Sequence, residues 1–248
     1  MSGHSKWSTI KRKKGAADAK RGQLFTKLAR EITVAARAGL PDPEANFRLR
    51  LAVQKARTEN MPKENIDRAI ERGSGDSTAD QFDEICYEGY GPGGTALMIL
   101  AMTDNRNRTV GEVRAALTRS GGTLGESGSV GWMFDQIGMI VLDATDQDPD
   151  ELALVAIDAG ANDVQVEDGS VEVYTDAQDL HRVQEALTAA GKVVESAELT
   201  MRPKTMMSPE PDVAVKAIRL LERLEDLDDV QQVYSNLDVS EDVLAQVG

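Results

Sequence analysis

The stretch that decides the fold is 164-VQVEDGSVEVY-174, two short runs of alternating apolar and polar residues around an Asp-Gly pair. Alternation with a period of two predicts β-strands at residues 164–167 and 171–174. The pair Asp168-Gly169 between them favours a tight turn, because both residues tolerate the backbone angles that such turns need. A β-hairpin is therefore expected over residues 164–174.

Helical and extended patterns flank this hairpin on both sides. Residues 150–159 and 180–190 have helical spacing, and each run is followed by a glycine, which is typical of a helix end. Residues 139–143 and 193–201 are predicted strands. The order from 139 to 201 is β-α-β-β-α-β, the arrangement of the ferredoxin-like fold.

The chain on either side of this unit predicts a second α/β unit. Before it come a strand at 94–103, a helix at 109–119 and a strand at 129–134. After it come a helix at 212–224 and a strand at 230–237. These five elements would complete a β-α-β-α-β domain that the ferredoxin-like unit interrupts.

Three amphipathic helices are predicted in the N-terminal third. The first covers residues 16–38. The second is expected to begin with Asp42 as N-cap and Pro43 in the first helical position. Pro62 is expected to open the third and Gly73 to close it. The predicted fold is α+β, with an N-terminal three-helix domain followed by two α/β ferredoxin-like domains, one inserted in the other. The predicted domains are residues 1–73, residues 80–136 together with 205–248, and residues 137–204.

The charge of the chain is divided sharply between its two ends. The whole protein has a net charge of -14, yet residues 1–37 hold ten Lys or Arg against two acidic residues, a net charge of +8. Residues 1–72 carry +9, so residues 73–248 carry -23. Clustered Lys and Arg attract phosphate backbones, and an acidic surface repels them. The N-terminal third is therefore the part expected to contact a polyanion.

Composition limits the class of protein further. The hydrophobic fraction of 41% and the charged fraction of 28% are ordinary for a globular protein, and no apolar run is long enough to span a membrane. The single cysteine, Cys86, fits a reducing cytoplasm and is expected to be a small buried residue. A basic, acid-poor N-terminus also occurs in transit peptides, but its continuation into a helix favours a folded cytoplasmic domain.

Two motifs resemble cofactor or metal sites and are interpreted otherwise. Residues 89–94 fit G-x-G-x-x-G, but they precede a strand and contain a proline, so a turn is expected. Asp146, Asp148 and Asp150 have calcium-loop spacing without the required glycine and final glutamate, which favours a solvated helix start. The two histidines, His4 and His181, have no partner motif. No cofactor, metal or small-molecule substrate is predicted, and an enzyme that uses the glycine loop is the disfavoured alternative.

The basic N-terminal segment is the main candidate binding site. Trp7 lies among Lys6, Lys11 and Arg12, and an aromatic ring among cations is typical of surfaces that stack on bases. The alternative is a solvated charge run. The predicted nucleic-acid-binding residues are Lys6, Trp7, Lys11, Arg12, Lys13, Lys14, Lys20, Arg21, Lys27 and Arg30.

A secondary candidate site follows the strand at 94–103. Residues 103–109, TDNRNRT, place two amides and two guanidinium groups in one short segment. These groups could hold phosphates or base edges, or the segment could simply cap the next helix at Thr109. The possible secondary contacts are Asn105, Arg106, Asn107 and Arg108.

Several long stretches of the sequence carry a resemblance to a known family: residues 3–7 (GHSKW), 18–22 (DAKRG), 25–28 (FTKL), 60–70 (NMPKENIDRAI), 87–94 (YEGYGPGG), 103–109 (TDNRNRT) and 121–135 (GGTLGESGSVGWMFD). At these positions the sequence resembles the YebC/PmpR family, which includes mitochondrial translational activators. The resemblance runs nearly end to end and is weakest in the inserted domain and at the C-terminus. Two departures are Arg12, where the family commonly has histidine, and Phe47, where a proline or small residue is frequent.

This resemblance implies a three-domain, cofactor-free cytoplasmic protein whose partner is a nucleic acid. Members have been described as DNA-binding transcriptional regulators, and others as translation factors that relieve ribosome stalling at proline-rich stretches. The expected function is therefore a non-enzymatic regulator of gene expression that binds DNA. The alternative is a ribosome-binding factor that contacts rRNA or tRNA. One scaffold can support both functions, so the fold does not decide between them.

Overall fold

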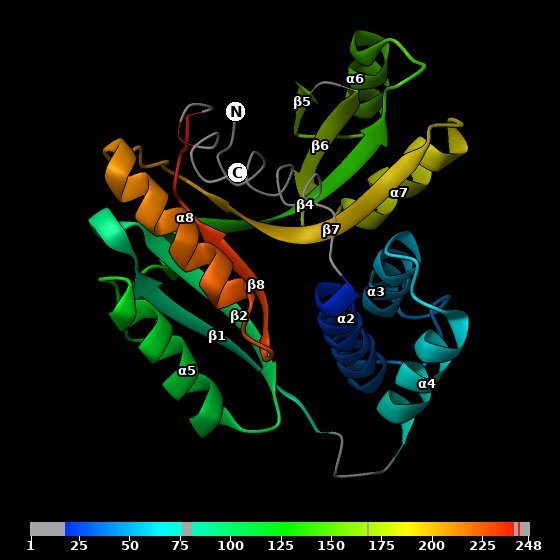
Figure 1. Cartoon of the computed structure of the whole chain (residues 1–248). Coiled ribbons are helices and arrows are strands. Elements are labelled where there is room, and N and C mark those ends of the chain that lie inside the picture. The colour runs from blue at the N-terminus through cyan, green and yellow to red at the C-terminus, as the bar shows by residue number, and fades with distance from the viewer. Residues whose placement is uncertain (1–17, 76–80, 168, 241–242, 244–248) are drawn as a thin grey trace. The chain divides into compact units, whose positions relative to one another are not determined.

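The computed structural model describes residues 18–75, 81–167, 169–240 and 243. Within these residues the chain forms two compact units. The first contains residues 18–30, 81–135 and those from 202 on, and the second contains residues 31–75 and 136–201. The class is α+β, as predicted: helices dominate the N-terminal third, and two four-stranded sheets follow (Figure 1).

The first unit is built on an antiparallel sheet. Three of its strands precede the strands of the second sheet in the chain, and the fourth follows them. The strand order is β3-β1-β2-β8, and two helices, α5 and α8, pack on one face (Figure 1). Leu97 and Ile99 of β2 contribute to the core below these helices. Its elements are β1 (Asp83–Tyr90), β2 (Ala96–Thr103), α5 (Arg106–Arg119), β3 (Thr123–Leu124), α8 (Pro211–Glu225) and β8 (Val230–Ser235).

The second sheet has the ferredoxin-like order β5-β6-β4-β7. The hairpin predicted around Gly169 is confirmed: β5 and β6 pair in antiparallel register, and Gly169 has a positive φ of 79°. Its elements are β4 (Phe134–Asp143), α6 (Pro149–Asp158), β5 (Asp163–Glu167), β6 (Ser170–Asp176), α7 (Leu180–Ala189) and β7 (Val194–Pro203).

Among the described residues, three helices precede the sheets: α2 (Asp18–Ala38), α3 (Phe47–Thr58) and α4 (Lys63–Ser74). Each buries one apolar stripe, as its periodicity predicts. The predicted start of α3 at Asp42 is wrong. Asn46 is the N-cap: its side chain accepts a hydrogen bond from Leu49 N and donates to the carbonyl of Ala35 near the end of α2. Helix α3 starts after Asn46 and not after Asp42, because Asn46 caps the helix and also holds it against α2.

The first unit differs from the prediction in two of its strands, one that was missed and one that was predicted wrongly. Strand β1 was not predicted, because its glycine-containing end was interpreted as part of a turn. The predicted strand at 129–134 is instead a single 3₁₀ turn, Gly131–Met133, followed by β4. The amides of Val130 and Gly131 bond to the carboxylate of Glu88, so they are not available to a sheet ladder. Cys86 lies on β1 and is exposed, against the expectation of burial.

Gly73 does not end α4 but lies buried inside it. A Cβ at this position would come within 2.5 Å of the Thr33 carbonyl and 2.6 Å of the Ala36 Cβ, both on α2. The backbones of α2 and α4 therefore approach each other closely at a point that only glycine permits.

We expect Gly73→Ala to lower the free energy of unfolding by about 1–3 kcal/mol, because the added methyl group overpacks this contact. Gly111→Ala in α5 is the matched control, since a Cβ there meets nothing within 4 Å. It should stabilise the helix by about 0.5–1 kcal/mol. Urea denaturation measures the change in the free energy of unfolding for both variants. Equal changes in the two would refute the packing argument.

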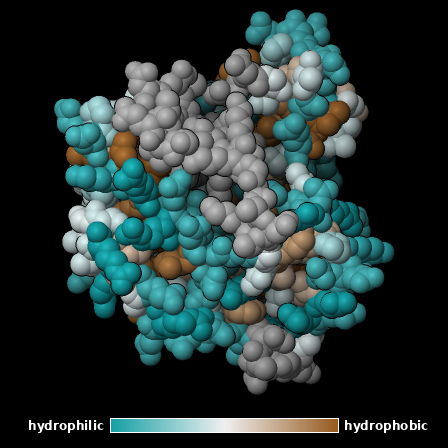
Figure 2. Space-filling model, viewed as in Figure 1, coloured by the Kyte–Doolittle hydropathy of each residue, from teal (hydrophilic) through white to brown (hydrophobic). Residues whose placement is uncertain are grey.

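The described surface is mostly hydrophilic on the face shown in Figure 2, with hydrophobic side chains in small groups. In the part of the chain that the structure describes, no helix is both long and apolar enough to cross a membrane.

Candidate nucleic-acid interface

Most of the predicted basic segment falls outside the described residues, and its role stays a prediction. Lys20 lies within α2, but its side chain is not described. Arg21 is exposed, with its guanidinium carbon 5.5 Å from the ring centroid of Phe25, a cation–π contact. The predicted residues outside the described range are Lys6, Trp7, Lys11, Arg12, Lys13 and Lys14.

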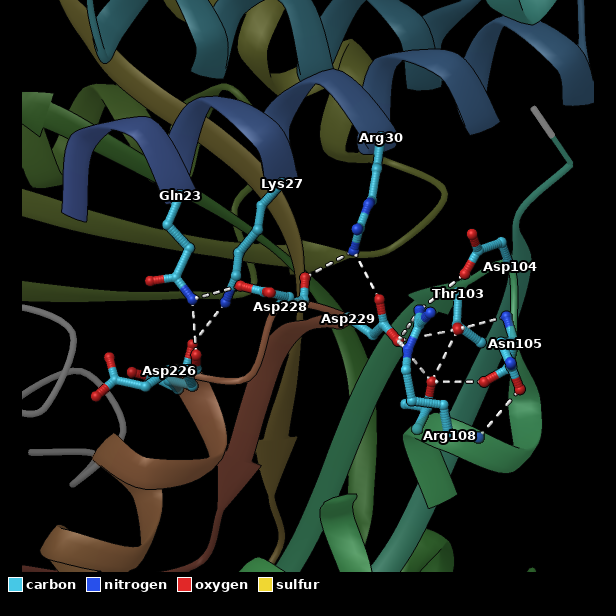
Figure 3. Close-up of polar contacts among 12 residues, drawn as sticks. Gln23, Lys27, Arg30, Thr103, Asp104, Asn105, Arg108, Asp226, Asp228 and Asp229 are labelled. Atoms are coloured by element: carbon cyan, nitrogen blue, oxygen red, sulfur yellow. Dashed lines mark hydrogen bonds and ion pairs between the residues drawn. The ribbon is translucent and has the colours of Figure 1, made fainter. Parts of the chain in front are cut away.

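The next polar side chains of α2 point toward the turn between α8 and β8 (Figure 3). Gln23 Nε2 donates to the carbonyl of Asp226 at 2.6 Å, and Lys27 Nζ donates to the carbonyl of Glu225. Both carbonyls lie at the C-terminal end of α8, where such oxygens lack partners within their own helix. A cation there also stabilises the negative end of the helix dipole. Lys27 therefore caps α8.

Arg30 continues this row and reaches the most buried acidic group of the unit. Its Nη1 donates to the carbonyl of Asp228 at 2.7 Å and to the Asp229 carboxylate at 2.9 Å. Its guanidinium also lies 5.4 Å from the ring centroid of Phe82. The structure thus places two of the predicted nucleic-acid-binding residues, Lys27 and Arg30, against the protein's own acidic turn at residues 225–229.

Asp229 is the centre of a hydrogen-bond network that joins four elements. Its side chain is only 2% exposed. Besides Arg30, it accepts hydrogen bonds from Arg108 Nη2 at 2.7 Å and from the hydroxyls of Thr103 at 3.0 Å and Thr109 at 2.7 Å (Figure 3). Burial alone would raise the pKa of Asp229, but these donors hold it below its ordinary value. The carboxylate is therefore ionised and fully bonded at neutral pH.

The secondary candidate segment is largely occupied by contacts within the protein. Helix α5 starts at Arg106 rather than at Thr109, because Asn105 is its N-cap and accepts a hydrogen bond from Arg108 N. The Arg106 side chain bonds to Asp83 at 2.7 Å on the surface. Arg108 bonds to Asp104 as well as to the buried carboxylate. Asn107 lies exposed in the first turn.

Both motifs that resembled ligand sites have the local structure that was expected of them, a turn and a helix start. Residues 89–94 end β1 and lead into β2 through the short turn Pro92–Gly94, with Gly93 and Gly94 at positive φ. Asp148 is the N-cap of α6 and accepts a hydrogen bond from Asp150 N. Among the described residues, no group of three or more His, Cys, Asp or Glu side chains is arranged to hold a metal ion.

The acidic charge is concentrated in one part of the chain. Residues 136–201 hold fifteen acidic and two basic residues, a net charge of -13. The segments assigned to the first unit, including the first thirty residues, sum to -2. A polyanion is therefore repelled mainly by the inserted sheet and not by the whole protein.

Comparison with known proteins identifies the family. Residues 5–76 match the model of the TACO1/YebC protein N-terminal domain, and residues 82–237 match that of the TACO1/YebC second and third domain. The protein belongs to the TACO1/YebC family, a class of regulatory proteins by the names of its curated members.

Several relatives match over nearly their whole length. A probable transcriptional regulatory protein of Roseiflexus castenholzii is 59% identical, covering 99% of this chain and 98% of the relative. One from Chloroflexus aurantiacus is 57% identical, covering 99% of each. The crystal structure of a conserved hypothetical protein from Aquifex aeolicus matches with a TM-score of 0.84 and 48% identity, covering 90% of this chain and 93% of that one.

Sequence patterns did not point to Asp229 as a special residue. It is one of four acidic residues between 225 and 229, and no local spacing distinguishes it from the others. Its partners lie 120 or more residues away along the chain. The pairing of β2 with β8 brings Asp229 to the end of β2 that carries Thr103.

Proposed function

We propose that this protein is a non-enzymatic regulator of gene expression that binds nucleic acid, and in the first place a DNA-binding transcriptional regulator. The observation that carries the proposal is the charge division: +8 over residues 1–37 against -13 over residues 136–201. Clustered cations bind phosphates by releasing counterions, and this supplies affinity without base recognition. The names of the curated relatives support the regulator function. Neither a cofactor nor a small-molecule substrate is part of the proposal.

A second candidate is an RNA-binding translation factor. It is favoured because several described polar groups that could read base edges already form hydrogen bonds within the protein. Asn105 caps a helix, and Arg106 and Arg108 bond to carboxylates, so these three side chains are less available for direct readout of duplex DNA. Trp7 beside the cations suits unpaired bases instead.

Salt titration tests the shared part of the proposal. Affinity is measured by fluorescence anisotropy for a labelled 20-base-pair DNA and a labelled 20-nucleotide RNA between 50 and 200 mM salt. If about six phosphates are neutralised, binding should weaken by roughly three orders of magnitude over this range. A nearly flat salt dependence, or no binding to either probe at 50 mM, would refute the proposal.

The same assay separates the two candidates. Trp7→Ala should weaken RNA binding more than duplex binding if Trp7 stacks on unpaired bases. Equal losses of affinity for both probes would argue against a stacking role for Trp7. The DNA-binding transcriptional regulator would then remain the favoured candidate.

A further inference from the structure

A large aromatic side chain is exposed on a well-held turn of the first unit. Trp132 lies in the 3₁₀ turn Gly131–Met133 between β3 and β4, and 68% of its surface is exposed. Tyr90, at the end of β1, is 37% exposed. An indole this exposed gives up most of the free energy that burial would supply, so its packing does not explain it.

The turn that carries Trp132 is anchored by one carboxylate. Glu88 accepts hydrogen bonds from the backbone amides of Gly128, Val130 and Gly131, each at 2.7 Å. Its own carbonyl accepts from Gly125 N at 2.8 Å. Burial would raise the pKa of Glu88, but the three amides hold it below its ordinary value. The turn is thus fixed in one conformation, and Trp132 is presented at a defined position.

The polar atoms of both aromatic side chains are already used. Trp132 Nε1 and the Tyr90 hydroxyl donate to the same acceptor, the carbonyl of Ser129, at 3.1 and 3.0 Å. The polar atoms of the two side chains therefore share one hydrogen-bond acceptor. What Trp132 offers to a partner is its flat π-face, which every nucleobase can stack on regardless of sequence.

Two carboxylates next to this turn, those of Glu88 and Asp135, have partners. The Glu88 carboxylate is surrounded by three N–H donors, and Asp135 forms an ion pair with Lys204 at 3.2 Å. The backbone amide of Lys204 also bonds to the carbonyl of Met133, which keeps this half-exposed cation beside the turn. The strongly acidic segment, residues 136–201, belongs to the other unit. The Glu88 and Asp135 carboxylates therefore oppose the approach of a phosphate chain to Trp132 less than unpaired carboxylates would.

We propose that the face of Trp132, presented by the Glu88-anchored turn, is a stacking site for an unpaired nucleobase. The base could come from RNA or from locally melted DNA, since the stacking chemistry is the same. This inference rests on the proposed nucleic-acid-binding function and adds a second contact to it, distinct from the basic N-terminal segment.

Intrinsic fluorescence gives a direct test, because Trp7 and Trp132 are the only tryptophans. In a full-length Trp7→Phe protein, all tryptophan emission comes from Trp132. We expect a 12-nucleotide poly(U) RNA and a 12-nucleotide poly(dT) DNA to quench this emission on binding, and a 12-base-pair duplex to bind without quenching it. If only one single strand quenches, that strand is the source of the base.

Affinity measurements with variants complete the test. Trp132→Ala in the otherwise native chain should weaken single-strand binding about tenfold, whereas Trp132→Phe should retain most of the affinity. Leu154→Ala removes another exposed apolar side chain, 64% exposed on α6, and should change nothing. Thermal melting shows that each variant is folded.

The outcomes separate this inference from the function on which it rests. If the native protein binds the probes with steep salt dependence but Trp132 is neither quenched nor needed, the stacking site is refuted and the proposed function stands. Such a result would leave Trp132 available to a protein partner. If the native protein binds none of the probes at 50 mM salt, both the function and the stacking site are refuted.

Discussion

Asp229→Ala is expected to lower the free energy of unfolding by about 3–5 kcal/mol. The substitution leaves the guanidinium groups of Arg30 and Arg108 without their shared carboxylate, and it leaves the hydroxyls of Thr103 and Thr109 without an acceptor. The loss is large because the carboxylate is buried and none of these donors regains full hydration in its place. Urea denaturation measures the effect.

Asp226→Ala is the matched control for this prediction. Asp226 is exposed, and the hydrogen bond that Gln23 makes to it goes to its main-chain carbonyl, which alanine keeps. Its effect should stay within about 0.5 kcal/mol. Comparable losses in the two variants would show that charge in the turn, and not the buried network, stabilises the unit.

The pH dependence gives a second measure of the same network. Because the folded-state pKa of Asp229 lies below its unfolded value of about 3.9, its contribution is fully present above that pH. The contribution is lost as the pH falls through the folded-state pKa. Acid unfolding of the native protein should therefore be steeper below about pH 4 than that of Asp229→Asn, which carries no titrating group at this position.

The second large effect is expected from the basic N-terminal segment. Replacing Lys11, Arg12, Lys13 and Lys14 with glutamine should reduce the slope of log affinity against log salt by about four units. If these side chains neutralise phosphates, each substitution removes one counterion-release contact. At 50 mM salt, binding of both probes should weaken by at least about a hundredfold.

An equal change of charge elsewhere provides the control. Glutamine at Arg57, Lys63, Arg68 and Arg72, which are exposed on α3 and α4, changes the net charge by the same amount. These substitutions should reduce affinity far less if the N-terminal segment forms the main contact. Equal losses would indicate a nonspecific effect of net charge and would contradict the assignment of the contact.

Local patterns predicted those elements whose signals lie within a few residues. The hairpin of β5 and β6 depends on an alternating pattern and one turn pair, and α2 depends on a long amphipathic period. Strand β1 was not predicted because its glycine-rich end continues into a turn. Its backbone hydrogen bonds come from pairing with β2, which the local sequence does not reveal. The start of α3 was misplaced because Asn46 makes a tertiary contact that no local signal encodes.

The candidate site was less predictable than the fold. Lys27 and Arg30 were predicted to bind nucleic acid, because a cationic side chain on the polar face of an amphipathic helix is ordinarily solvated. The structure gives Lys27 a main-chain carbonyl and Arg30 a buried carboxylate as partners, both about 200 residues away. Long-range pairing of this kind follows from the order of the strands, so composition and periodicity could not reveal it.

The most direct test of the central claim is photo-crosslinking of the native protein in cells, followed by sequencing of the recovered nucleic acid and mapping of the crosslinked peptides. The account predicts nucleic acid crosslinked to peptides from the first 21 residues, and its loss in the variant with glutamine at positions 11–14. Discrete promoter DNA in the recovered fraction would support the transcriptional regulator, and rRNA with tRNA the translation factor. Recovery no greater than that of the neutralised variant would contradict the account.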